Sequence, residues 1–396
     1  MSLESTIPSE QQALCLRAAG LDQLKLERMP VAQPKDDEIL VRIDAVGMCA
    51  SDVKLAIQGN NHTRTKGMDL SVQPIIPGHE VSLTVIKPGK ARAKNYKPGQ
   101  RYSVQANITY KGKEMCYGYR LGGAMQQFQC IGSPVIDTGS LLAIDPKLGY
   151  AQAALAEPWA CVYYSYYRHR AGRQVLRGGT AWYVGAGPLG LMHIEKGIAD
   201  GAKKIVVSEL SQMRLDKVRQ SLGPLAEKAG ANLILVNTGK EPVGKYLGKA
   251  EADDIVILCP AAKAAEKAVE YLAFEGYMNI FAGFPSRDKS NITLNLNDMH
   301  YGGWTLVASS GSPIEALVKA LADAATGKID PNNAVACVGG LNAAKEAIQA
   351  VHDGTYPGRI VIYPQLNMPL TNTAELAPQG CWSNAVEKKL LKSTSS

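Results

Sequence analysis

Residues 181–190 read AWYVGAGPLG, and residues 205–209 read IVVSE. An apolar β-type run leads into the glycine-rich turn, and a helix-compatible stretch follows it. Such a turn lets the backbone approach a pyrophosphate, and the helix N-terminus directs N–H groups and positive dipole at that anion. Glu209 lies 19 positions after Gly190, where a carboxylate can accept hydrogen bonds from the adenosine ribose and repel a 2′-phosphate. The pattern predicts a dinucleotide site that prefers NAD, with NADP as the alternative. The residues expected to hold the dinucleotide in this turn are Gly185, Gly187, Pro188, Leu189 and Gly190.

The segments on either side of this turn predict two kinds of domain. From residue 179 onward, strand-like and helix-like segments alternate, which predicts a doubly wound parallel sheet with right-handed crossovers. Residues 13–150 instead carry short β-type runs separated by Gly, Pro and Asp turns, which predicts a small barrel-like β domain. We therefore expect an α/β protein with a catalytic β domain over residues 1–151 and a Rossmann domain over residues 152–311. Residues 312–396 read as helices and a strand that return to the catalytic domain.

Composition narrows the class of protein. The 396 residues are 46% hydrophobic and 20% charged, with a net charge of +7, which suits a globular chain with a large core. The basic stretch over residues 87–101 contains Tyr96 as its one aromatic residue, so we expect no nucleic-acid partner. The eight cysteines form no CxxC pair, which favours free thiols in a reducing compartment. The N-terminus is polar, and no run approaches the ~20 apolar residues that span a bilayer. We expect a cytoplasmic protein with no membrane partner.

Three segments supply possible metal ligands, namely GMCASD at residues 47–52, PGHE at 77–80 and AEP at 156–158. One cysteine, one histidine and one or two glutamates make a mixed S, N and O donor set, which suits a catalytic zinc with an open position. Each segment alone is ordinary: Cys49 fits a small buried residue, His79 a loop histidine, and Glu157 a helix start before proline. Their occurrence together, ahead of a dinucleotide fold, predicts one catalytic zinc.

GMCASD, PGHE, the Glu-Pro pair and GAGPLG followed by an acid, in this order, resemble the zinc-dependent medium-chain dehydrogenase/reductase superfamily over nearly the whole chain. Within it the resemblance is closest to the sorbitol dehydrogenase-like branch. The insert over residues 58–72, the segments NIFAGFPSR and HYGGWTLVASSGS, and the ending VIYPQLNMPLT look more like the narrower L-sorbose 1-phosphate reductase-like group. The resemblance implies a GroES-like catalytic domain, a Rossmann domain, and a cleft between them that holds zinc and NAD(P).

The resemblance also implies roles for individual residues. The implied zinc ligands are Cys49, His79, Glu80 and Glu157, the last able to exchange with water; which of the two glutamates binds zinc directly stays open. Ser51 would relay the substrate proton, and Asp52 would orient a ligand. Arg214 matches a position that packs on the adenine or ribose.

Many members of the superfamily carry a second, structural zinc held by four closely spaced cysteines. The corresponding stretch here, residues 106–130, contains only Cys116 and Cys130. Two distant thiols cannot close a tetrahedral site, so we expect no structural zinc.

These features predict a zinc-dependent oxidoreductase that transfers a hydride between NAD(H) and a secondary alcohol or ketone of a polyol, sugar or sugar phosphate. Two alternatives stay open: a zinc-free quinone- or enoyl-type reductase of the same fold, and a non-catalytic nucleotide-binding protein. The insert between Lys54 and Lys66 is polar and basic, which suits sugar hydroxyls or a phosphate. The candidate phosphate-binding cations are Arg64, Lys66 and Arg120, and Tyr117, Tyr119, His300 and Tyr301 are candidate cleft residues.

The expected partners are a small-molecule substrate and further copies of the chain. Residues 304–309, WTLVAS, read as the edge strand of the Rossmann sheet. Because an exposed apolar edge invites pairing with another chain, we expect a homodimer or homotetramer. The physiological direction of the reaction stays open.

Overall fold

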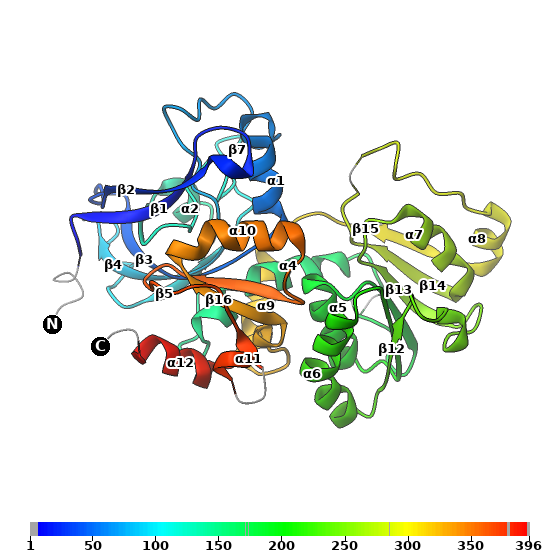
Figure 1. Cartoon of the computed structure of the whole chain (residues 1–396). Coiled ribbons are helices and arrows are strands. Elements are labelled where there is room, and N and C mark those ends of the chain that lie inside the picture. Colours follow the sequence, from blue (N-terminus) through cyan, green and yellow to red (C-terminus); the bar gives the residue numbers. More distant parts are fainter. Residues whose placement is uncertain (1–6, 171, 173, 285, 378–380, 394–396) are drawn as a thin grey trace. The chain divides into compact units, whose positions relative to one another are not determined.

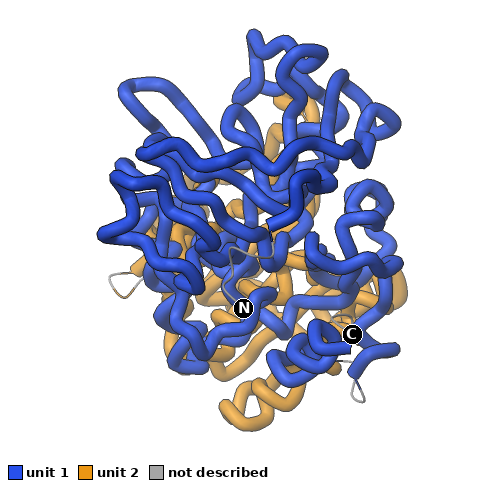
Figure 2. The backbone as a smooth tube through the Cα atoms, turned by 90° about the vertical axis from the view of Figure 1, so that its left-hand side faces the viewer, with its two compact units in different colours: residues 1–160, 312–396 blue, residues 161–311 orange. Residues whose placement is uncertain are grey.

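The computed structural model describes residues 7–170, 172, 174–284, 286–377 and 381–393. The chain divides into two compact units: residues 1–160 with 312–396, and residues 161–311 (Figure 2). The division falls inside helix α4 (Ala156–Ser165), nine residues later than the boundary expected from sequence. The sequence-based boundary was placed where the strand-rich region ends, whereas the helical segment that begins there continues through α4 before the units divide. No helix in the described ranges is long and apolar enough to cross a membrane.

The first unit is built on an eight-stranded, mainly antiparallel sheet with the order β18-β16-β17-β3-β4-β5-β9, and β8 pairs with β3 (Figure 1). Its strands are β3 (Ile39–Gly47), β4 (Glu80–Pro88), β5 (Arg101–Val104), β8 (Phe128–Ile131), β9 (Leu141–Ala143), β16 (Val335–Gly340), β17 (Arg359–Tyr363) and β18 (Thr371–Asn372). Two separate hairpins join β1 (Glu10–Leu16) to β2 (Leu24–Pro30) and β6 (Thr109–Tyr110) to β7 (Lys113–Glu114). The remaining helices of this unit are α1 (Ala50–Gln58), α2 (Ser133–Ile136), α3 (Tyr150–Ala154), α9 (Ile314–Ala325), α10 (Ala344–Asp353), α11 (Thr373–Leu376) and α12 (Asn384–Ser393).

Strand register in this sheet brings distant parts of the chain together. β3 and β4 are buried along almost their whole length, and both contribute to the main core. Gly47, at the end of β3, pairs with Glu80, at the start of β4, and with Val361 of β17 on its other side. The end of β3 therefore joins the N-terminal half of the unit to its C-terminal strand.

The second unit is a six-stranded parallel sheet with the order β12-β11-β10-β13-β14-β15. Its strands are β10 (Thr180–Val184), β11 (Lys204–Glu209), β12 (Asn232–Asn237), β13 (Ala252–Ile257), β14 (Leu272–Ile280) and β15 (Thr305–Ala308). Its helices are α5 (Pro188–Asp200), α6 (Gln212–Ala229), α7 (Ala262–Ala268) and α8 (Leu296–Gly302). The predicted doubly wound parallel sheet is confirmed: α5 and α6 lie side by side on one face, and α7 and α8 lie on the other (Figure 1). The strand order reverses at β10, and this is where dinucleotides bind in such folds.

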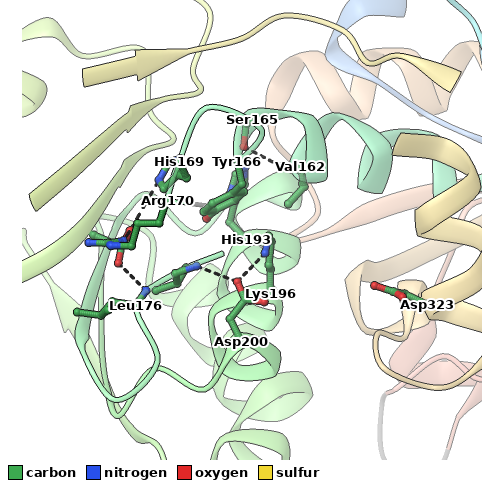
Figure 3. Close-up of polar contacts among 12 residues, drawn as sticks. Val162, Ser165, Tyr166, His169, Arg170, Leu176, His193, Lys196, Asp200 and Asp323 are labelled. Atoms are coloured by element: carbon green, nitrogen blue, oxygen red, sulfur yellow. Dashed lines mark hydrogen bonds and ion pairs between the residues drawn. The ribbon is translucent and has the colours of Figure 1, made fainter. Parts of the chain in front are cut away.

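A buried polar cluster ties the chain after α4 to the second unit's sheet and to α5 (Figure 3). The Tyr166 hydroxyl lies 3.1 Å from Nδ1 of His193, and Nζ of Lys196 lies 2.5 Å from the Asp200 carboxylate. Arg170 donates to Asp254 of β13 at 2.6 Å. Burial, reinforced by Lys196, lowers the pKa of His193 to about 3, so this histidine is neutral in the folded protein.

Candidate active site

Cys49, His79 and Glu80 form a compact group of side chains with metal-ligand donor atoms in the first unit, the metal-binding group. One ligand atom from each lies within 4.8 Å of the other two. Cys49 is the N-cap residue of α1, two residues after β3 ends, while His79 directly precedes β4 and Glu80 begins it. Both His79 and Glu80 are buried. The strand pairing of β3 with β4 thus brings together residues that are thirty positions apart in the sequence.

Two glycines make room for this group. A Cβ at Gly47 would overlap the Glu80 carboxylate, so the smallest residue is needed opposite it. Gly78 has a φ of 96°, a backbone conformation that favours glycine and turns the chain into His79.

Asp52 holds two members of the group in place, which agrees with the orienting role expected for it. Its Oδ2 accepts a hydrogen bond from the Cys49 N–H at 3.0 Å, and its Oδ1 lies 3.3 Å from Nδ1 of His79. With Nδ1 facing Asp52, Nε2 of His79 is left for a metal. Burial alone would lower the pKa of His79, but Asp52 and Tyr119 outweigh it and raise the pKa well above its ordinary value. The negative charge of Asp52 that favours a proton on this ring would equally stabilise a metal ion bound to the neutral ring.

The Glu80 carboxylate supplies the clearest test of whether a metal fits. Its Oε2 forms a buried ion pair with Arg359 of β17. Its Oε1 is buried and has no hydrogen-bond partner among the described residues. Leaving a charged oxygen buried and unpaired is costly, and a zinc ion bound with Cys49 and His79 would satisfy it. The donor set therefore fits zinc.

Glu157 lies outside this three-residue group but close enough to interact with it electrostatically. It is buried in the first turn of α4. Burial raises the pKa of Glu157 to about 7, with His79 opposing the rise and Glu80 adding to it. Ser51, in the first turn of α1, has its hydroxyl 3.5 Å from Sγ of Cys49. The hydroxyl is therefore at the edge of the metal-binding group, where the predicted proton relay requires it.

Arg359 is the residue that the sequence analysis missed. It opens β17, an otherwise apolar strand, and is itself buried. A lone arginine at the start of the run RIVIY was the available signal, since a buried cation requires a partner. Its partner Glu80 is 279 positions away, so the pair could not be identified without the fold.

One wall beside the metal-binding group comes from the predicted polar insert and from the segment that follows β7. The Tyr119 ring lies 5.8 Å from the His79 ring and 5.3 Å from the His62 ring. The Arg64 guanidinium carbon lies 5.0 Å from the centre of the same tyrosine ring. Of the candidate residues, Tyr117 is buried and donates to Gln129, which makes it part of the packing.

Four further residues that the sequence analysis singled out make no recorded side-chain contact with Cys49, His79 or Glu80 among the described residues. Arg120 donates to the backbone oxygen of Lys66 at 3.0 Å. Tyr301, on α8 in the second unit, is 71% exposed. Cys116 lies 3.3 Å from a Glu114 oxygen and Cys130 lies 3.5 Å from the Ala32 carbonyl.

The glycine-rich turn of the second unit has the geometry of a nucleotide-binding turn. Gly185 has a φ of 115°, and a Cβ at Gly190 would lie 2.8 Å from the Gly185 carbonyl oxygen. Gly187 is the N-cap of α5, and Pro188 is its first residue. A Cβ on Gly187 would meet nothing within 4 Å, so the face over the helix N-terminus is open to a ligand.

Glu209 is fixed beside this turn at the end of β11. Its Oε2 accepts the Ala186 N–H at 2.9 Å, and its Oε1 accepts the N–H groups of Leu210 at 2.8 Å and Ser211 at 3.1 Å. Arg214 lies 3.6 Å from Oε2. The carboxylate is thus held in one orientation; Oε1 already accepts two hydrogen bonds, and Oε2 keeps one lone pair for a further donor.

Comparison with known proteins agrees with this geometry. Residues 35–162 match the family model of the alcohol dehydrogenase GroES-like domain. The chain is 30% identical over 396 residues to mannitol-1-phosphate 5-dehydrogenase of Aliivibrio fischeri (strain ATCC 700601 / ES114), covering 94% of this chain and 92% of the relative. It is 27% identical over 406 residues to L-sorbose 1-phosphate reductase of Klebsiella pneumoniae, covering 96% and 98%. A zinc-binding dehydrogenase from Sinorhizobium meliloti 1021, solved with NADP, shares the fold at a TM-score of 0.71 and 18% identity, covering 90% of this chain and all of that one. The chain therefore belongs to the zinc-dependent medium-chain dehydrogenase/reductase superfamily, in its sorbitol dehydrogenase-like group, and is an oxidoreductase.

Proposed function

We propose that this enzyme is zinc-dependent and transfers a hydride between NAD(H) and a secondary alcohol or ketone of a polyol, sugar or sugar phosphate. The observation that carries the proposal is the group of Cys49, His79 and Glu80 with one Glu80 oxygen buried and unpaired. The names of the two relatives support the substrate class, because one acts on a polyol phosphate and the other on a ketose phosphate. The same group argues against the zinc-free reductase alternative, which has no use for such ligands.

In the proposed site, Cys49, His79 and Glu80 hold the metal, and Glu157 binds beside them, directly or through water. A zinc ion held there would act as a Lewis acid on the substrate oxygen. Ser51 takes the proton that the substrate hydroxyl releases and passes it to water, or returns one in the direction of reduction. Asp52 holds the His79 ring and the Cys49 backbone N–H in fixed positions while the charge at the site changes.

The glycine-rich turn binds the dinucleotide, which would accept or supply the hydride. The open face over Gly187 takes the pyrophosphate, and Glu209 accepts the ribose hydroxyls. Arg214 packs on the adenine or ribose. Because the Glu209 carboxylate is fixed at this position, it would repel a 2′-phosphate and favour NAD over NADP.

The function is tested by elemental analysis of zinc-replete enzyme together with NADH absorbance on a panel of polyols, ketoses and their phosphates. We expect about one zinc per chain and turnover with at least one polyol or ketose. Binding of NADH without any turnover would support the non-catalytic alternative. Reduction of quinones or enones by metal-free enzyme would support the zinc-free reductase.

We also propose that the enzyme acts in the cytoplasm. All eight cysteines are free thiols, which suits a reducing compartment.

A further inference from the structure

Arg64 stands out among the charged groups near the metal-binding residues because its guanidinium is held in place. It donates from Nη2 to the Asn107 side chain at 2.8 Å and pairs through Nε with Glu114 at 3.3 Å. One face of the guanidinium lies over the Tyr119 ring. No contact is recorded for its Nη1 within the described ranges, and the side chain is 29% exposed. The protein therefore fixes the orientation of the Arg64 guanidinium, while its Nη1 stays available for a ligand.

The neighbouring His62 adds a second donor of fixed direction. Its Nδ1 accepts a hydrogen bond from the Arg64 backbone N–H at 3.2 Å, so its ring proton is on Nε2. The ring is buried against Tyr119. Burial lowers the pKa of His62, and the charges of Lys54 and Arg64 lower it further. The charge of Glu114 opposes this shift.

The other cations of the region do not share these features. Arg120 donates a hydrogen bond from Nη2 to the Lys66 backbone oxygen and so helps to hold the loop. The Lys66 side chain itself is exposed. Arg64 alone touches Tyr119, whose ring also contacts the metal-binding His79.

We propose that Arg64 determines substrate specificity by binding a phosphate monoester of the substrate while the reacting alcohol or ketone lies at the metal-binding group. The proposal rests on the proposed function and deepens it. A guanidinium binds phosphate oxygens through charge-assisted hydrogen bonds, and one already fixed by Asn107, Glu114 and Tyr119 loses little side-chain freedom on binding. His62 donates from Nε2 to the same substrate. Asn107 and Glu114 act as positioning residues for the guanidinium.

The test compares matched substrates with and without phosphate, namely mannitol 1-phosphate with mannitol and sorbose 1-phosphate with sorbose. The zinc-loaded wild-type enzyme should have a higher kcat/KM for the phosphorylated member of at least one pair. In Arg64→Met, the ratio of kcat/KM for the phosphorylated over the neutral substrate should fall by about 10- to 100-fold, mainly through KM, because a charged hydrogen bond is lost. Arg64→Lys should recover part of that ratio, since it restores charge but not the fork.

Arg120→Met is the matched comparison, because it removes a rival cation from the same region. The proposal is overturned if this variant loses the phosphate preference and Arg64→Met keeps it, or if the wild type uses both members of each pair equally. It is also overturned if Arg64 instead governs preference for a sugar acid, which would make the bound group a carboxylate. Titration calorimetry with mannitol 1-phosphate provides a readout without turnover. A higher Kd for mannitol 1-phosphate in Arg64→Met supports the role of Arg64 even if the enzyme catalyses no redox reaction. Failure of this proposal can therefore be told apart from failure of the proposed function.

Discussion

At the scale of single residues, the proposed chemistry of the first unit depends on charged side chains in which some polar atoms have no hydrogen-bond partner among the described residues. Glu80 is the clearest case, since Arg359 binds one of its oxygens and the other has no partner within the described residues. A buried carboxylate oxygen without a partner is destabilising even though Arg359 pairs with the other oxygen. We therefore expect a metal ion bound at Glu80 to stabilise the folded protein.

Cys49→Ser is expected to lower zinc content and to reduce activity by more than about tenfold, because a hydroxyl is a poor substitute for a thiolate ligand. Elemental analysis and NADH-linked turnover measure the two effects. Cys130→Ser is the control, since Cys130 contacts a backbone carbonyl away from the metal-binding group. Full zinc occupancy in Cys49→Ser would remove Cys49 from the ligand set.

Glu209→Gln is expected to shift cofactor preference toward NADP by about tenfold, the effect of ~1.4 kcal/mol of lost repulsion. The amide keeps one oxygen acceptor for the backbone N–H groups but carries no charge to repel the 2′-phosphate. The measurement is the ratio of kcat/KM for NAD over NADP in the wild type and the variant. A wild type that uses both cofactors equally would contradict the role given to Glu209, and the nearby Arg214 would then be the group that tolerates the phosphate.

The candidate site could be predicted from the sequence only in part. Cys49, His79 and Glu80 were predicted together because their donor types occur together ahead of a dinucleotide fold and match a family motif. The structure places one ligand atom of each within 4.8 Å of the others. Glu157 was predicted with them but lies outside the group, since its position depends on how α4 packs. Arg359 was missed because its partner is distant in the sequence. Local sequence patterns thus predicted the helices, the strands and the ligand motifs. Which charged side chains contact one another depends on the tertiary fold.

At the scale of secondary-structure elements, the C-terminal helix α12 stabilises the segment that leads to Glu157. Glu387 of α12 is buried and accepts the Tyr150 and Ala151 N–H groups, each at 2.7 Å, at the start of α3. It also accepts the Tyr363 hydroxyl of β17 at 2.7 Å. One carboxylate thus satisfies the free N–H groups of one helix and binds the strand that carries Arg359.

Glu387→Ala is expected to destabilise the protein by about 2 kcal/mol or more, because three donors, two of them buried, lose their acceptor. Hydrogen exchange of α3 and thermal unfolding measure the effect, and faster exchange should be concentrated at α3. Lys388→Ala, an exposed position on the same helix, serves as the control. Unchanged protection of α3 in Glu387→Ala would show that α12 is not needed to hold it.

The polar cluster around α5 predicts a dependence of stability on pH. His193 has a folded-state pKa lowered to about 3, below its ordinary value of 6.5, so the unfolded state binds more protons between these two values. Stability should therefore fall as pH decreases from 6.5 toward 3, by at most about 1.4 kcal/mol per pH unit from this group. His193→Gln should reduce this slope in urea unfolding across a pH series, whereas the exposed His300→Gln should not. Equal slopes in the wild type and His193→Gln would exclude His193 as the source.

At the scale of the whole molecule, the proposed function is divided between the two units: the first would supply the metal ligands and Arg64, and the second would supply the dinucleotide turn and Glu209. The second unit also has an edge strand with one open side. β15 is the last strand of its sheet and pairs only with β14 among the described strands, and Ala308 at its end is exposed. An open strand edge is a template for pairing with another chain.

We expect this edge to pair with its twofold-related copy, which would make one continuous sheet in a homodimer, or in a homotetramer built from such dimers. Light scattering at micromolar concentration should give at least twice the mass of the chain. Ala308→Lys should weaken the association, because a charge on an edge strand opposes strand pairing, while Val318→Lys, at a half-exposed position on α9 in the first unit, should not. A monomeric mass for the wild type would refute the pairing, and a dimer that Ala308→Lys leaves intact would place the interface elsewhere.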